Sequence, residues 1–300
     1  MKPYLWMTDY TPQEEWIDRQ GLLLWLAFFF TEIGAGLYVV SLFFKFWRGC
    51  LLGWLISAIL GGGLHMLYLG RPERAWRAIL RPLKSEFSRG LIIMILFLAV
   101  GAIHIAPSVP YLSGLPWQSD LLFFKVLLTV LGLFVMAHGF MTMNVVSAIP
   151  FWNSAVLPVL SLASGIWMGS QLGVFFSIAF SEGELLLPVE LFARWSLFSY
   201  ALLILFFLWN ASHSSSAGRN SLRVIVKGDL AWLFYLGLVL VGLIIPIAIT
   251  LALLGAESGP NQGFLMLRVV CAVLGDATLR YLVTKSGRYS PLIYSNIVKG

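Results

Sequence analysis

The chain has 300 residues, of which 59% are hydrophobic and only 11% are charged, and its formal net charge is +6. Soluble domains carry roughly 25% charged residues and cover their core with a polar surface. The composition therefore excludes a soluble enzyme, a disordered chain and a secreted disulfide scaffold. The two cysteines, Cys50 and Cys271, lie far apart within or beside apolar stretches, so we expect them to be packing residues.

Eight stretches are apolar for about the 20 residues that a helix needs to cross a bilayer. They cover residues 21–44, 51–69, 90–106, 121–149, 154–180, 191–210, 229–254 and 264–283. The connections between them are short and contain turn-forming or charged residues, which leaves no room for a soluble domain. The sequence thus predicts one polytopic all-α integral membrane domain with eight transmembrane helices. Residues 1–20 are rich in acidic and aromatic side chains, and we expect them to form an interfacial segment.

The basic residues indicate how the protein is oriented. With eight spans both termini lie on one face, which we call the terminal face. Fifteen of the 20 Lys and Arg residues fall on this face, six of them between residues 71 and 89, and five fall on the opposite face. The positive-inside rule then places both termini in the cytoplasm, in a multi-pass protein of the inner (cytoplasmic) membrane. Because the basic residues lie in short connections, lipid headgroups explain the net charge better than nucleic acid does.

Three ionisable residues stand out within the expected spans, where charge is costly and usually functional. Glu32 lies about 16 Å into the first span, close to the midplane. It is either a proton-relay carboxylate or a structural acid that is protonated or paired with arginine. Asp276 and Arg280 lie one helical turn apart in the last span, and mutual neutralisation is the simpler account of that pair. Together the three residues form a candidate proton relay.

The four histidines test whether the protein binds haem, because two axial ligands from facing helices must lie at one depth. His65 lies roughly 6 Å and His138 roughly 16 Å from the terminal face. His104 and His213 lie at or beyond the ends of other spans. We therefore expect no haem.

His65 instead favours a site for a polar head on an apolar tail. Tyr68 and Arg71 follow it closely, so an imidazole, a phenol and a guanidinium group gather at one helix end. A quinone head accepts hydrogen bonds at two carbonyl oxygens and exchanges protons with its electrons, which His and Tyr side chains support. These residues favour a quinone site near the terminal face.

Several motifs occur along the sequence in a fixed order. They are Glu32-Ile-Gly34-Ala-Gly36, Leu69-Gly70-Arg71-Pro72-Glu-Arg74-Ala-Trp76, Ser85-Glu86-Phe-Ser88-Arg89-Gly90, Pro150-Phe-Trp152-Asn153 and Gly275-Asp-Ala-Thr-Leu-Arg280-Tyr281. As an ordered set they resemble the NrfD-like family of polysulfide-reductase and nitrite-reductase type membrane subunits, which includes the dimethyl sulfoxide reductase anchor.

The resemblance implies a haem-free subunit with no catalytic metal centre of its own. Residues 21–149 would form a quinone-binding four-helix bundle, and residues 150–300 a second helical group. The cofactor implied is menaquinone or ubiquinone. The partners implied are an iron–sulfur ferredoxin-like subunit with 4Fe–4S clusters and a molybdopterin catalytic subunit, in a respiratory oxidoreductase of anaerobic respiration.

The resemblance also implies which residues surround the quinone head. In this sequence the corresponding positions are Gln20, Tyr68 with His65 one turn earlier, and His138. All four lie toward the terminal face or just behind it, which makes that face the expected dock for the iron–sulfur partner. The residues expected to shape the dock are Arg71, Arg74, Trp76 and Asn153.

Two other functions fit the composition. A secondary transporter or proton-conducting subunit would use Glu32, Asp276 and Arg280, although transporters usually contain inverted repeats and the sequence shows none. A b-type cytochrome would need a histidine pair at one depth.

Overall fold

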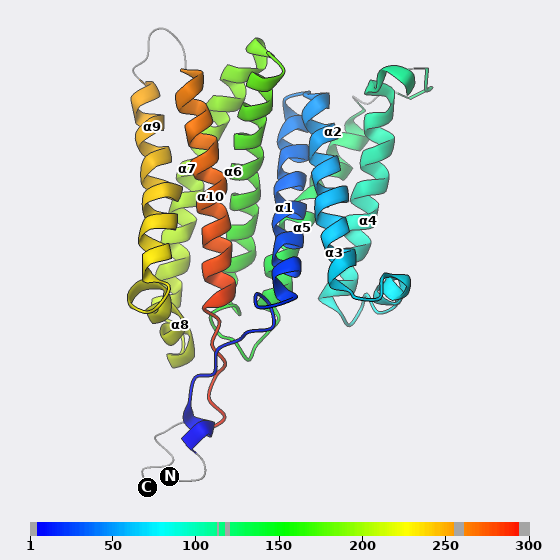
Figure 1. Ribbon diagram of the computed structural model, residues 1–300. Helices are drawn as coiled ribbons and strands as arrows, with labels where there is room; N and C mark the ends of the chain where they lie inside the picture. Colours follow the sequence, from blue (N-terminus) through cyan, green and yellow to red (C-terminus); the bar gives the residue numbers. More distant parts are fainter. Residues whose placement is uncertain (1–4, 113, 118–120, 255–260, 294–300) are drawn as a thin grey trace.

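The spanning helices run roughly parallel to one another (Figure 1). The computed structural model describes residues 5–112, 114–117, 121–254 and 261–293. Within these residues, eight helical segments are long and apolar enough to cross a membrane. They are α1 (Gly21–Phe43), Trp47–Tyr68, α4 with its extension (Glu86–Ser108), α5 (Leu122–Asn144), α6 (Val156–Ala179), α7 (Gly183–Ser212), Leu233–Leu254 and α10 (Gln262–Lys285). The predicted all-α fold of a multi-pass membrane protein is confirmed.

Two of the spans change helix type along their length. Trp47–Tyr68 consists of α2 (Trp47–Leu55), the π-helical η2 (Ile56–Gly62) and α3 (Gly63–Tyr68). Leu233–Leu254 consists of the π-helical η6 (Leu233–Ile244) and α9 (Ile245–Leu254). Two short helices, η3 (Pro72–Leu80) and α8 (Ser216–Lys227), connect spans at the terminal face.

Two of the expected boundaries differ from the structure in ways that affect the site. The fourth span ends at Asn144, because residues 145–152 form turns ahead of α6. The sixth span begins at Gly183, eight residues before the expected start, and passes through Pro188. A proline is tolerated there because a membrane helix can re-satisfy the freed backbone groups with its neighbours. Glu190 therefore lies inside a spanning helix.

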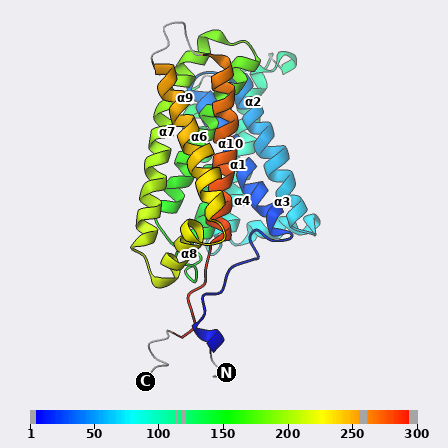
Figure 2. The ribbon, with the colours of Figure 1, turned by 60° about the vertical axis from the view of Figure 1, so that its left-hand side comes forward.

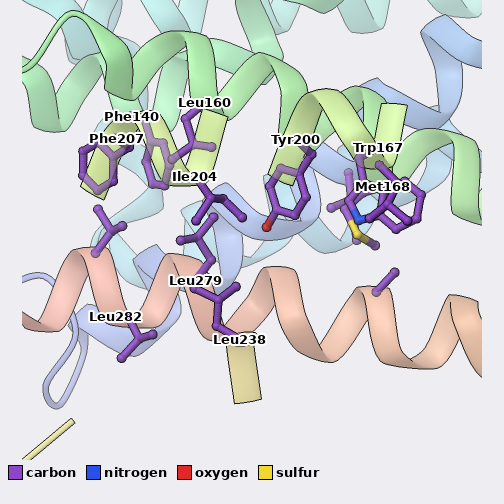
Figure 3. Packing of buried hydrophobic residues seen from close by; sticks show 14 of the residues in the cluster. Phe140, Leu160, Trp167, Met168, Tyr200, Ile204, Phe207, Leu238, Leu279 and Leu282 are labelled. Carbon is purple, nitrogen blue, oxygen red and sulfur yellow. The ribbon is translucent and has the colours of Figure 1, made fainter. Parts of the chain in front are cut away.

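The first helix is the most enclosed element of the fold. In α1, 78% of the most apolar window is buried, the largest share among the described spans. Phe29 and Ile33 belong to a hydrophobic cluster shared with α6, α7 and α10, whereas Tyr38 and Val39 belong to a second cluster with α4 and α5. Helix α1 thus joins two packed groups; Figure 3 shows part of the larger one, including Trp167 and Tyr200.

Close contact between α1 and α6 depends on glycine. A Cβ atom added at Gly36 would overlap the Gly165 carbonyl, and one added at Gly169 would overlap the Gly36 backbone. Small residues allow helix backbones to approach in this way inside membranes. Dispersion contacts between the two backbones therefore replace the hydrophobic effect that lipid does not provide.

The described ends of the protein lie together beyond the terminal face (Figures 1 and 2). The backbone N–H of Gln13 donates to the Gly287 carbonyl at 3.0 Å, and that of Tyr289 donates to Thr11 at 2.9 Å. Lys285 forms an ion pair with Asp18 at 2.6 Å. The segment before α1 is thus held by the segment after α10.

We expect Gly36→Ala to destabilise the protein by about 1–3 kcal/mol, the usual cost of overpacking. Gly63→Ala is the matched control, because a Cβ atom there meets nothing within 4 Å. Thermal unfolding of the detergent-purified protein, followed by tryptophan fluorescence, measures both. Equal melting temperatures for the two variants would contradict the role given to Gly36.

Candidate functional site

A buried guanidinium group holds two carboxylates at the centre of the fold. Arg280 on α10 forms ion pairs with Glu32 on α1 and with Asp276, the latter at 2.8 Å between Nε and Oδ2. The three side chains are 3%, 1% and 0% exposed. Ser161 on α6 donates to Oε2 of Glu32 at 2.7 Å. The predicted pairing of Asp276 with Arg280 is confirmed, and Glu32 joins it.

Helices α6 and α7 complete the surroundings of Asp276. Its Oδ1 accepts hydrogen bonds from Ser164 at 2.5 Å and from Tyr200 at 3.0 Å, and Figure 3 shows the Tyr200 hydroxyl turned toward α10. Arg280 also donates from Nη2 to Ser164 at 2.5 Å. Four helices therefore meet at one polar cluster, which we call the central cluster.

One oxygen of the central cluster faces a small cavity. Oε1 of Glu32 is buried and has no hydrogen-bond partner among the described residues. It lies against Gly139, where a Cβ atom would overlap it. The cavity beside it is about 20 Å³ and is lined by Phe28, Gly139 and Arg280 among others, which is room for about one water molecule.

A second buried ion pair lies on α7 and α10 and was missed from the sequence. Arg268 donates to Glu190 at 3.0 Å and to Thr250 at 3.2 Å, and both members of the pair are 0% exposed. Arg194 pairs with the same carboxylate at 2.7 Å. Arg268 is one of the five basic residues counted on the opposite face, but its charge is neutralised inside the protein and therefore does not indicate orientation. Glu190 lies inside the spanning helix because α7 begins earlier than expected. Placing the start of this span correctly would have indicated that Glu190 needs a buried partner.

Two histidines line one cavity between α3, α4 and α5. His65 and His138 share it with Met66, Met94 and Gly90 among others, and its volume is about 40 Å³. The ring of Phe28 meets both imidazoles edge to face, at centroid distances of 5.3 Å and 5.8 Å. We call this space the histidine cavity.

His65 and His138 lie closer to one depth than the sequence predicts. Helix α5 ends at Asn144, so His138 lies six residues, or roughly 9 Å, from its end. His65 lies three residues, or roughly 5 Å, from the end of α3 at Tyr68. The long fourth span expected from the sequence had placed His138 too deep.

A local hydrogen bond determines which ring nitrogen of His65 carries the proton. Nδ1 of His65 lies 2.9 Å from the Gly61 carbonyl in the π-helical η2, and a carbonyl only accepts, so Nδ1 carries the proton. The Thr142 hydroxyl donates to the His138 carbonyl at 2.9 Å and lies 3.5 Å from Nδ1 of the same residue. In the neutral His65 ring Nε2 is then the hydrogen-bond acceptor.

Gly90, the last residue of the motif Ser85-Glu86-Phe-Ser88-Arg89-Gly90, leaves room for the His138 ring. A Cβ atom at this position of α4 would overlap the ring atoms of His138. The His138 imidazole therefore lies directly against the α4 backbone. Gly62, on the opposite wall, has more room, because a Cβ atom there would lie 3.4 Å from the Met94 methyl group.

Tyr68 and Gln20 lie together at the terminal face. They line a hollow of about 520 Å³ with Glu14, Glu15 and Asp18 among others. Gln20 is exposed and Tyr68 is partly buried. The structure thus divides the four expected quinone residues into two pairs, with His65 one turn along the helix from Tyr68.

The expected docking residues lie in two places. Arg71 and Arg74 are exposed on and beside η3, and Trp76 is 57% exposed with the Arg77 guanidinium 5.5 Å from its ring. Asn153 lies on another connection, between α5 and α6, where its side-chain amide donates to the Asn144 carbonyl at 2.6 Å. Asn153 therefore stabilises the turn between α5 and α6.

The other two histidines lie away from the histidine cavity. His104 is buried at the opposite face, 2.7 Å from the Tyr38 hydroxyl. His213 follows the end of α7 and is exposed beside Trp209, at a centroid distance of 4.9 Å. His104 and His213 therefore lie outside the histidine cavity.

Comparison with known proteins agrees with the motifs. The family model described as polysulphide reductase, NrfD, matches residues 19–290. The C component of polysulfide reductase from Wolinella succinogenes is 27% identical over 169 residues, which is 55% of the present protein and 53% of the relative. The alignment thus spans about half the length of each protein. Because the family model covers nearly the whole sequence, the protein belongs to the polysulphide reductase NrfD family.

Proposed function

We propose that the protein is the membrane anchor subunit of a multi-subunit respiratory oxidoreductase, where it binds quinone or quinol and exchanges electrons with a docked iron–sulfur subunit. The observation that carries the proposal is the histidine cavity. Two imidazoles from different helices line it, and in its neutral form each offers one acceptor nitrogen, which is Nε2 in His65. The family membership supports the role of a membrane subunit.

The side chains around the histidine cavity suit the polar head and the apolar tail of a quinone. A quinol hydroxyl can donate to Nε2 of a neutral imidazole, and a quinone carbonyl can accept from a protonated one. The cavity of about 40 Å³ must widen to admit a ring, and two of its walls are Met66 and Met94, whose unbranched side chains repack readily. Tyr68 and Gln20 lie at the terminal-face side of the same region, around the larger hollow.

Quinone supplies the two-electron chemistry, and the protein supplies binding and proton transfer. His65 holds its proton at Nδ1 through the Gly61 carbonyl, so Nε2 is the atom that takes or gives a proton. Phe28 packs against both imidazoles and also lines the cavity of Glu32. His138 and Gly139 are consecutive and line one cavity each.

A proton relay through Glu32, Asp276 and Arg280 extends the proposal. Two carboxylates share one guanidinium, so the central cluster is neutral when one carboxylate holds a proton. The unpartnered Oε1 of Glu32 faces the small cavity next to the histidine cavity. We place the proton acceptor for the imidazoles there.

The proposal also includes a surface on which the partner subunits dock. Tryptophan and arginine are the residue types most often decisive at protein interfaces, and η3 exposes both on the terminal face. The partners proposed are a ferredoxin-like subunit with 4Fe–4S clusters and a molybdopterin subunit, in the inner membrane. The short distance in sequence from His65 to Arg71 would bring the nearest cluster close to the quinone head.

We expect His138→Ala and Gly90→Ala to lower quinone-dependent turnover of the assembled complex by about 100-fold or more, the usual contribution of a positioned acid–base group. Gly63→Ala is the matched control, because Gly63 does not line the histidine cavity and a Cβ atom there meets nothing within 4 Å. Turnover with a soluble quinol and co-purification of the partners are measured together. Loss of assembly in Gly90→Ala, or equal turnover of the two glycine variants, would contradict the site.

We expect Glu32→Gln to keep the protein folded, because an amide oxygen still accepts from Arg280 and Ser161. Proton release into the medium during quinol turnover in vesicles should fall at least tenfold, with binding of the quinol unchanged. Ser170→Ala, at a buried hydroxyl that bonds to Ser196 rather than to the central cluster, is the control. Proton release equal to that of the wild type would exclude Glu32 as a relay group.

We expect charge reversal at Arg71 and Arg74 to abolish co-purification of the soluble partners, since a like charge opposite an acidic surface costs several kcal/mol. Reversal of Arg219 and Arg223 on α8 changes the net charge of the same face equally and serves as control. Retention of the partners by the first variant would remove η3 from the dock.

A further inference from the structure

Helix α8 has no part in the proposed function and has two opposite faces. It begins after Ser215, whose hydroxyl accepts from the Gly218 N–H at 3.3 Å, and it runs for 12 residues between α7 and the following span. Figures 1 and 2 show it at the lower end of α7, on the side where the described ends of the protein lie.

One face of α8 packs on the bundle and the opposite face is basic. Ala217, Ser221 and Ile225 are buried at four-residue intervals. Arg219, Arg223 and Lys227 are exposed at the same interval, two residues further along. A shift of two residues is roughly 200° around a helix, so the basic stripe points directly away from the packed face.

The three cations of this stripe are not neutralised within the described part of the protein. None of them is in an ion pair with a described residue; Arg219 makes one hydrogen bond, from Nη1 to the Ser214 carbonyl at 2.7 Å. Three positive charges therefore lie within roughly 12 Å along the helix. Such a stripe attracts an anionic surface.

Aromatic side chains place α8 at the level of the lipid headgroups. Trp209 near the end of α7 is 56% exposed, and Trp232 at the start of the next span is 64% exposed. Phe206 stacks on Trp209 at 5.6 Å. Tryptophan is enriched where a membrane protein crosses the interface, and α8 joins these two positions.

We propose that the basic stripe of α8 binds the phosphate groups of anionic phospholipids. Basic side chains on an amphipathic helix at the interface are attracted to anionic lipid. A soluble partner is disfavoured as the occupant because the flanking tryptophans hold the helix at the membrane surface. The proposal is independent of the quinone site.

Native mass spectrometry of the full-length protein in neutral detergent tests the proposal. The probes are phosphatidylglycerol, phosphatidylcholine and inorganic phosphate. We expect the wild type to retain phosphatidylglycerol preferentially, and Arg219→Gln/Arg223→Gln/Lys227→Gln to weaken that binding by about fivefold for each basic residue removed. Binding of phosphatidylcholine should not change.

The matched control is Arg77→Gln/Arg81→Gln/Lys84→Gln, which removes three charges from the same face outside α8. We expect it to retain phosphatidylglycerol as the wild type does. Undiminished phosphatidylglycerol binding by the α8 variant would overturn the proposal, and so would an equal loss in the control. Displacement of the lipid by millimolar inorganic phosphate, or loss of the soluble partners without loss of lipid, would also overturn it.

Discussion

The structure depends on one buried guanidinium group. Arg280 would be prohibitively costly inside a membrane if it were alone, and two carboxylates with three hydroxyl groups around them make it tolerable. Removing one partner from such a buried pair typically costs about 3–5 kcal/mol. Because the partners come from α1, α6, α7 and α10, the charge cluster fixes how these four helices meet.

The central cluster also determines where chemistry can occur. It holds α1 in place, and α1 carries Phe28 between the histidine cavity and the cavity of Glu32. Gly36, Gly90 and Gly139 bring helices or side chains into contact at points where any Cβ atom would intrude. The shape of the cavities therefore depends on the missing side chains at these glycines as much as on the residues that line them.

Most of the fold could be predicted from the sequence, since eight apolar stretches of spanning length leave few alternatives. Helix ends could not, because turns at residues 145–152 and a tolerated Pro188 depend on neighbouring helices. That error misplaced His138 and hid the Glu190–Arg268 pair. The Asp276–Arg280 pair was predictable because it is local in sequence, whereas its link to Glu32 joins residues 248 positions apart.

The central claim is that quinone binds between α3, α4 and α5. A photoreactive azidoquinone, activated with the purified protein in nanodiscs and mapped by peptide mass spectrometry, tests it most directly. The account predicts labelling within residues 62–69, 87–94 and around His138, suppressed by excess unlabelled quinone. Competable labelling confined to other helices, such as α7 and α9, would contradict it.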